Sequence, residues 1–175
     1  MMEGIALDDK VYELLNDQIN KELYSAYLYL DMANFYADKG LAGFQNWFNI
    51  QAQEERDHAM LMLQYLHNNG QHVELKAIAK PDKEFKDLMD PLKMALEHEE
   101  YVTSLINGIY AAASDVKDYR TLQFLDWFVK EQGEEEMNAQ ENISKMELFG
   151  GDPKGLYMLN SELQGRVYSA PSLVL

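Results

Sequence analysis

The 175-residue sequence contains no cysteine. Disulfide bonds, thiolate metal sites, iron–sulfur clusters and cysteine nucleophiles are therefore all excluded. Any metal ion that this chain binds must be held by oxygen atoms and by the imidazole nitrogens of its four histidines.

Long apolar runs and basic charge are also scarce. No segment approaches roughly 18 uninterrupted apolar residues, and residues 1–10 lack a basic region followed by an apolar run. We therefore expect a soluble, cytoplasmic protein. Fifteen basic residues against 30 acidic ones give a net charge of −15, which repels nucleic acid and anionic membranes and attracts cations. We expect neither nucleic acid nor membrane as a partner, although the charge alone indicates no more than solubility.

The sequence has enough apolar residues, 47%, to close one substantial core, so we expect a single domain over residues 1–175. Apolar residues recur at helical spacing along four long segments. Gly40 and Gly70 are placed to end the first two, and Asp90-Pro91 to cap the third. The expected helices span 8–39, 41–69, 90–114 and 118–149, with a short fifth at 152–163 and a tail at 164–175. Their inward residues include Leu15, Ile19, Ala26, Ala33, Phe44, Phe48, Ala59, Met62, Leu92, Leu96, Val102, Ile106, Phe124, Phe128, Ala139 and Ile143.

About twenty residues, 70–89, have no sustained period and are long enough to cross a whole bundle. Two short turns around one long crossover indicate an all-α four-helix bundle. The second and fourth helices also match at an offset of 80 residues, as in Phe44 with Phe124 and Glu55 with Glu135. This similarity indicates two related helical hairpins.

Each long helix carries a carboxylate on its apolar stripe. Glu22 interrupts the first, Glu99 the third, and Glu131 and Glu135 the fourth. The second carries the sharpest motif, Glu55-x-x-His58, which places a carboxylate and an imidazole one turn apart on one face.

An isolated glutamate in a core costs several kcal/mol, so four at one depth require compensation. Divalent cations supply it, and oxygen ligands with one imidazole suit iron(II), manganese or zinc. We therefore predict a dinuclear metal site. A single such glutamate would more often be a solvated helix residue, but four interrupted stripes together favour the metal site. We expect His67, His72 and His98 to be surface residues, and Tyr29 to pack mainly in the core, with a possible second role donating an electron or a hydrogen bond.

At these residues the sequence resembles the non-haem ferritins of bacteria and archaea. The segments NKELYSAYLY, QAQEERDHA, EHEEYV and FLDWFVKEQGEEE match in order and spacing, over almost the whole chain. The resemblance implies a ferritin-like bundle and three iron sites. The first would comprise Glu22, Glu55 and His58; the second Glu55, Glu99 and Glu135 with Gln132 nearby; and the third Glu54, Glu131, Glu134 and Glu135.

The resemblance further implies an iron storage protein with ferroxidase activity. Iron(II) would enter a homo-oligomeric shell of 24 subunits, be oxidised by dioxygen or hydrogen peroxide at the paired site, and accumulate as ferric oxyhydroxide. Three alternatives remain open. A haem-containing bacterioferritin is disfavoured because Arg56 stands where that family has its haem-binding methionine, and Asn138 where it has a second histidine. A dimetal oxygenase would need a pocket for an organic substrate, which the sequence does not indicate. A shell subunit without the oxidation site would lack the metal ligands, which this sequence contains.

Overall fold

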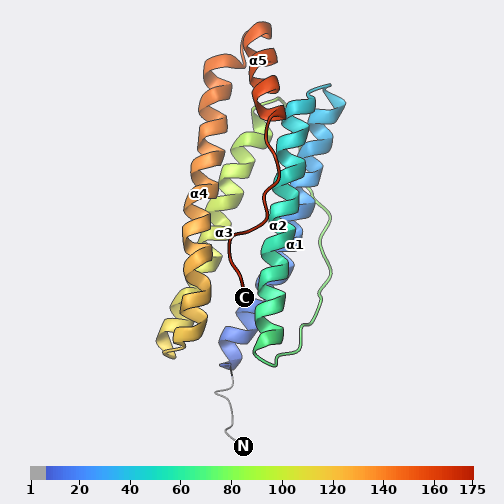
Figure 1. Cartoon of the computed structure of the whole chain (residues 1–175). Coiled ribbons are helices and arrows are strands. Elements are labelled where there is room, and N and C mark those ends of the chain that lie inside the picture. The colour runs from blue at the N-terminus through green and yellow to red at the C-terminus, as the bar shows by residue number, and fades with distance from the viewer. Residues whose placement is uncertain (1–6) are drawn as a thin grey trace, which may run out of the picture.

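The computed structural model describes residues 7–175, which fold into a bundle of four long helices with a short fifth helix across one end (Figure 1). No strand occurs within this range. The helices are α1 (Asp9–Asp38), α2 (Ala42–Asn68), α3 (Asp90–Asp115), α4 (Tyr119–Phe149) and α5 (Pro153–Gln164). The expected all-α bundle is thus confirmed, and its helices end within a residue or two of the expected positions.

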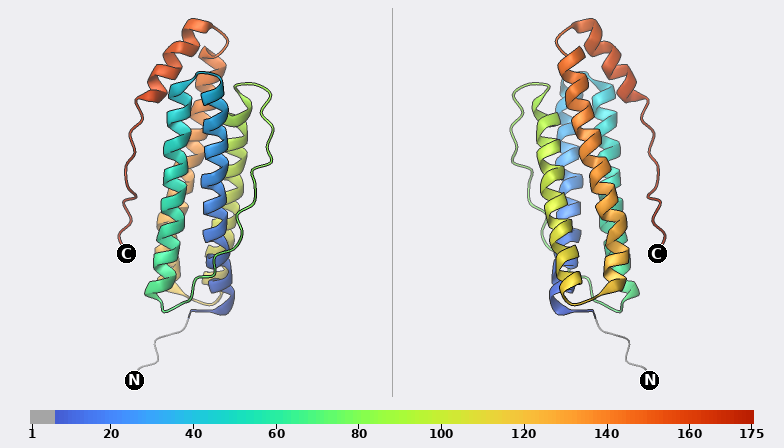
Figure 2. Two further views of the ribbon diagram at one scale, coloured as in Figure 1. Left: turned by 90° about the vertical axis from the view of Figure 1, so that its right-hand side faces the viewer. Right: turned by 90° about the vertical axis from the view of Figure 1, so that its left-hand side faces the viewer.

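The bundle consists of two antiparallel hairpins, α1 with α2 and α3 with α4, which meet chiefly along α1 and α3. The crossover from 70 to 89 runs along the outside of α1 from one end of the bundle to the other (Figure 2). Helix α5 folds back from the end of α4 onto the start of α2. The chain after α5 returns along the bundle as an extended tail.

Local signals set most of the helix ends. Gly40 and Gly70 adopt φ values of 73° and 71°, the left-handed conformation that terminates a helix at little cost to glycine. Asp152 caps α5, since its Oδ2 accepts from the backbone N–H of Gly155 at 2.8 Å. The expected cap at Asp90 is wrong, because Asp90 is the first helical residue. The N-cap is Met89, which has no side-chain cap, and Asp87 in the preceding turn accepts from the backbone N–H groups of Met89 and Asp90.

The core is divided in two by a polar layer. One apolar cluster lies toward the end where α1 begins and includes Leu15, Met62 and Phe124. The other lies toward α5 and includes Phe44 and Leu159. The predicted carboxylates lie between the clusters, so the break that each apolar stripe shows in the sequence is a layer in the structure. Three of the residues expected to face inward, Ala26, Leu96 and Ala139, are only half-buried, because they lie at the edges of their stripes.

The crossover is attached to α1 by side chains. Asn16 is 4% exposed and pairs twice with the backbone of Glu74, donating to its carbonyl at 3.1 Å and accepting from its N–H at 2.9 Å. Near the other end, the hydroxyl of Tyr36 donates to the carbonyl of Leu88 at 2.6 Å. Among the helices of residues 7–175, a membrane-crossing length of apolar sequence is not found.

Candidate metal centre

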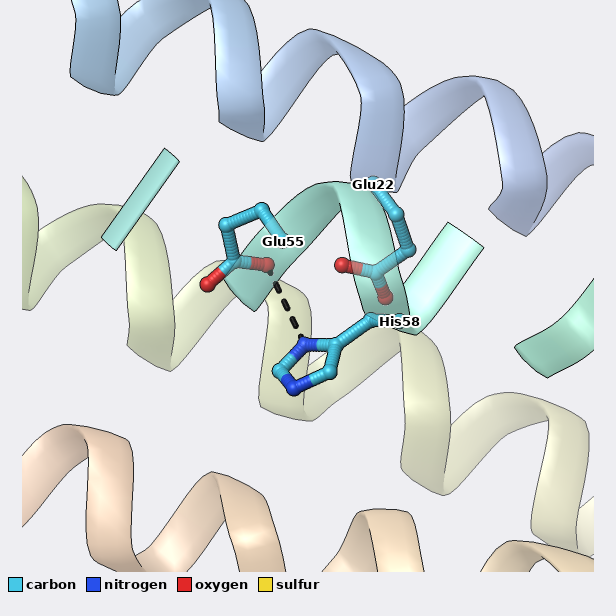
Figure 3. A group of neighbouring side chains, drawn as sticks. All are labelled: Glu22, Glu55 and His58. Atoms are coloured by element: carbon cyan, nitrogen blue, oxygen red, sulfur yellow. Dashed lines mark ion pairs between the residues drawn. The ribbon is translucent and has the colours of Figure 1, made fainter. Parts of the chain in front are cut away.

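Five acidic or histidine side chains converge in the polar layer, and all four long helices contribute. Glu22 comes from α1, Glu55 and His58 from α2, Glu99 from α3 and Glu135 from α4. Each is between 0% and 5% exposed. Figure 3 shows Glu22 facing Glu55 and His58 across the space between α1 and α2. These are the residues assigned to the paired site from the sequence.

Their ligand atoms lie close enough for shared ions. One ligand atom from each of Glu22, Glu55 and His58 lies within 4.8 Å of the other two, and the same holds for one carboxylate oxygen from each of Glu55, Glu99 and Glu135. Both groups contain Glu55. A carboxylate common to two adjacent ligand sets is suited to bridging two ions.

The donor set fits cations for a second reason. Glu22 Oε2, Glu55 Oε2 and His58 Nδ1 are buried and have no hydrogen-bond partner within residues 7–175. The nearest approach is between His58 Nδ1 and Glu55 Oε2, at 3.3 Å (Figure 3). Buried polar atoms nearly always have a hydrogen-bond partner, so three such atoms without one in the same place need an explanation. Cations coordinated by these lone pairs would provide it.

Other oxygens of these carboxylates accept hydrogen bonds from uncharged side chains. Gln18 donates to Glu22 at 2.9 Å, and Gln51 donates to Glu55 at 3.2 Å and to Glu135 at 2.7 Å. Such partners orient metal ligands. Neither glutamine was predicted from the sequence to contact the site. Each precedes a ligand glutamate by four residues, one helical turn, and that spacing is the signal that would have found them.

Glu99 is held from two sides. The buried hydroxyl of Tyr29 donates to Glu99 Oε1, and Gln132 Nε2 donates to Glu99 Oε2 at 3.1 Å. Of the two additional roles considered for Tyr29, the structure shows the hydrogen bond. Gln132 lies beside the carboxylates, as the resemblance implied.

Burial dominates the electrostatics of the cluster. Desolvation raises the pKa of Glu55 well above its ordinary value, and the charges of Glu99 and Glu22 add to this effect. The pKa of Glu135 is raised for the same reasons, burial first and then the charges of Glu55 and Glu99. Burial also raises the pKa of Glu99, to about 7, although the hydrogen bonds from Tyr29 and Gln132 oppose the shift.

The four residues of the implied third site do not come together in one group of neighbouring ligand atoms. Glu131 is half-buried, and one of its carboxylate oxygens lies within 4.8 Å of a ligand atom of His58 and of one of Glu135. Burial raises its pKa, and the nearby charges of Glu134 and Glu54 contribute. Glu134 is exposed, whereas Glu54 is ion-paired with Arg166 at 2.5 Å. In this structure Glu54 is therefore held by a protein cation.

Two of the three remaining histidines, His67 and His72, are exposed as expected. The expectation for His98 is wrong. His98 is half-buried between α1 and α3, where its Nε2 lies 2.7 Å from Ser25 Oγ and its ring meets Tyr29 edge-on at 5.9 Å. Burial lowers its pKa to about 4, so it is neutral near neutral pH.

The whole chain can be compared with known protein families. Residues 12–149 match the model of the ferritin-like domain. The chain belongs to the ferritin family. It is 38% identical over 158 residues to the bacterial non-heme ferritin of Campylobacter jejuni, covering 90% of this chain and 95% of that protein. The non-heme ferritin of Staphylococcus haemolyticus is 36% identical over 162 residues, covering 93% and 98%.

Solved ferritins share the fold as well as the sequence. An Archaeoglobus fulgidus ferritin engineered into a closed form superposes with a TM-score of 0.91 at 40% identity, covering 94% of this chain and all of that one. The open-pore ferritin of the same archaeon gives a TM-score of 0.89 at 41% identity, covering 92% and 98%. The resemblance inferred from four sequence segments is confirmed, and membership of the family supports a role in iron storage.

Proposed function

We propose that this ferritin is a ferroxidase, which oxidises iron(II) at the paired carboxylate–histidine site and stores the product as a ferric mineral. The observation that carries the proposal is the set of buried, unpartnered ligand atoms on Glu22, Glu55 and His58, adjacent to a second carboxylate group that shares Glu55. In a subunit that served only to build the shell, burying these unpartnered ligand atoms would cost free energy without any benefit.

In the proposed reaction, Glu22, Glu55 and His58 bind one iron(II), and Glu55, Glu99 and Glu135 bind the other. Because the folded pKa values of Glu55, Glu99 and Glu135 are raised, iron binding displaces protons from whichever of these carboxyls are protonated. Each iron(II) gives up one electron, so the pair delivers two. With two protons, these electrons reduce dioxygen to hydrogen peroxide, or reduce hydrogen peroxide to two molecules of water. The anionic carboxylates stabilise the more highly charged iron(III) product.

Storage requires an enclosed volume, and we extend the proposal to a homo-oligomeric shell of 24 subunits. Its support is the coverage of complete ferritin chains at TM-scores near 0.9, including an archaeal ferritin described as having an open pore. The net charge of −15 per subunit attracts iron(II) toward such a shell. Glu54, Glu131 and Glu134 would serve an accessory third iron site beside Glu135.

Substitution of ligands tests the proposal. We expect Glu55→Ala and His58→Ala to slow iron oxidation by more than about a hundredfold, since loss of a side chain that only orients a metal ligand already costs up to that much. Assembly should persist because both residues lie inside the bundle. Stopped-flow absorbance gives the rate and sedimentation the assembly state, with His67→Ala as the control, an exposed histidine on the same helix. Wild-type rates in either ligand variant would refute the site assignment.

We also propose that the protein does not use haem. Arg56, at the position of the bacterioferritin methionine, is an exposed cation on the outer face of α1 and α2. It offers no thioether to an iron porphyrin, and the curated relatives are named as non-heme ferritins. A stoichiometric Soret band after expression with haem available would overturn this view.

A further inference from the structure

The tail that follows α5, residues 165–175, closes the side of the bundle between α2 and α4. In the described part of the chain, no Cα atom of one of these two helices lies within 8 Å of a Cα atom of the other. The tail descends along this seam (Figures 1 and 2) and contacts both helices. The hydroxyl of Tyr168 donates to Asp57 of α2 at 2.5 Å, and the indole of Trp127 on α4 donates to Ser172 at 3.0 Å.

Arg166 is the residue of the tail that reaches toward the iron cluster. Its Nη1 donates to the carbonyl of Trp47 and to Gln51 Oε1, each at 3.0 Å, and its Nη2 donates to Glu54 Oε2 at 2.5 Å. The guanidinium carbon also lies 4.0 Å from the centre of the Trp47 ring. The side chain is 15% exposed, so the arginine is fixed by a ring, a carbonyl, an amide and a carboxylate.

The contact with Gln51 has a consequence inside the bundle. An arginine can only donate hydrogen bonds, so the oxygen of the Gln51 amide must face Arg166. The amide nitrogen then faces inward, where it donates to Glu55 and Glu135. Reversing the amide would direct its oxygen at two carboxylates. Arg166 thereby selects the orientation in which Gln51 holds the bridging glutamate and its neighbour from α4.

The contact with Glu54 has a different consequence. Glu54 belongs to the proposed accessory site, and its Oε2 is occupied by the guanidinium. An iron ion coordinated through that oxygen would compete with Arg166 for the same lone pairs. Arg166 and the accessory iron are therefore alternatives at this atom, although Arg166 can keep its contacts with Trp47 and Gln51 when Glu54 leaves it.

From these contacts we propose that Arg166 is a positioning residue of the iron cluster, which orients Gln51 toward Glu55 and Glu135 and holds Glu54 until a cation displaces it. The inference rests on the proposed ferroxidase function, and assigns to the tail a role in tuning both sites. Removal of Arg166 should weaken cation binding at the paired site, where an orienting partner is lost. It should strengthen binding at the accessory site, where a competitor is lost.

Calorimetric titration of the assembled, metal-stripped protein with Zn²⁺ tests this without oxidation. We expect Arg166→Gln to weaken the affinity of the paired site for Zn²⁺ by about 10- to 100-fold, the usual effect of losing a hydrogen-bond partner that orients the metal ligands. The same variant should tighten the accessory site by roughly tenfold, the worth of one charge-assisted hydrogen bond. Arg166→Lys keeps the charge beside Glu54 but loses the planar fork that also reaches Gln51. It should weaken the paired site and leave the accessory affinity near that of wild type.

Tyr168→Phe is the matched control, because it removes a tail contact to Asp57, which has no part in the proposed iron sites. Its two affinities should equal those of wild type, and sedimentation should show assembled shells for every variant. If Arg166→Gln and Tyr168→Phe shift the affinities alike, the tail is only a structural cover and the inference is overturned. It is equally overturned if Arg166→Gln changes neither affinity while wild type still binds Zn²⁺ at the paired site. If wild type itself binds no Zn²⁺ there, the proposed function fails first.

Discussion

At the scale of the residue, the centre is an arrangement that the folded chain does not favour without a cation. Glu55, Glu99 and Glu135 all have raised pKa values, with burial as the largest cause. The folded state therefore holds protons more tightly than the unfolded state. The contribution of these carboxyls to stability is greatest below their unfolded pKa, near 4.3, and it is lost as pH rises through their folded pKa values. For Glu99 this loss extends from about pH 4 to a little above 7. Bound cations reverse it by favouring the ionised ligands.

Glu99→Gln isolates this cost. The substitution removes one charge at nearly constant shape, so we expect the metal-free protein to be more stable at neutral pH, by roughly 1–3 kcal/mol. The gain should shrink toward pH 4, where Glu99 is protonated in both states. Gln132 must turn its amide over to accept from the new amide group, which reduces the gain. Bound Zn²⁺ should stabilise the variant less than it stabilises wild type.

Thermal unfolding of matched, metal-stripped samples at pH 4.5 and 7.5 measures this effect, and equal scan rates are needed because shells can unfold irreversibly. Lower stability in the variant at pH 7.5, together with an unchanged increment from Zn²⁺, would make Glu99 a structural hydrogen-bonding residue. The second ion would then have to be bound without it.

At the scale of the element, helical periodicity and capping residues carried most of the information. The bounds of most helices were predictable because glycine at positive φ and aspartate caps act locally, as at Gly40, Gly70 and Asp152. The cap of α3 was misplaced because two aspartates stand close together, and only the folded turn decides that Asp90 lies inside the helix while Asp87 accepts from the backbone N–H groups of Met89 and Asp90.

What the sequence could not supply were contacts between elements that are far apart along the chain. The ligand set could be predicted because each glutamate interrupts its own helical stripe. Arg166 lies in a segment without periodicity and meets Gln51 and Glu54 more than a hundred residues away. His98 was misjudged for the same reason, since Ser25, which lies beside it, belongs to another helix.

The crossover offers a prediction at this scale. Asn16→Ala removes a buried pair of hydrogen bonds to the backbone of Glu74, so it should cost about 1–3 kcal/mol. Amide hydrogen exchange in residues 70–78 should become faster, while iron oxidation stays unchanged because the change lies outside the cluster. Asn20→Ala is the control, since Asn20 bonds the same segment through solvent-exposed hydrogen bonds and its loss should have a smaller effect. Equal exchange in Asn16→Ala and wild type would show that the crossover is held by its apolar contacts instead.

At the scale of the whole molecule, stability and function are separated by layers. The apolar clusters on either side of the polar layer hold the bundle together, and the layer between them is available for ion binding. Helices α2 and α4 face each other across the seam with a buried glutamate each, Glu55 and Glu135. The two segments that match at an offset of 80 residues thus face each other, and each supplies one glutamate to the same site.

The central claim is that one subunit binds two iron(II) ions side by side and oxidises them as a pair. Anaerobic titration of the assembled protein with iron(II), followed by an oxygen pulse, tests it most directly. We predict a transient absorbance from a diferric species, whose amplitude saturates at about two iron ions per subunit. It should persist in Glu131→Ala and Glu134→Ala, which alter only later turnovers, and vanish in Glu55→Ala. Saturation at one iron ion per subunit, or a transient undiminished in Glu55→Ala, would contradict the paired site.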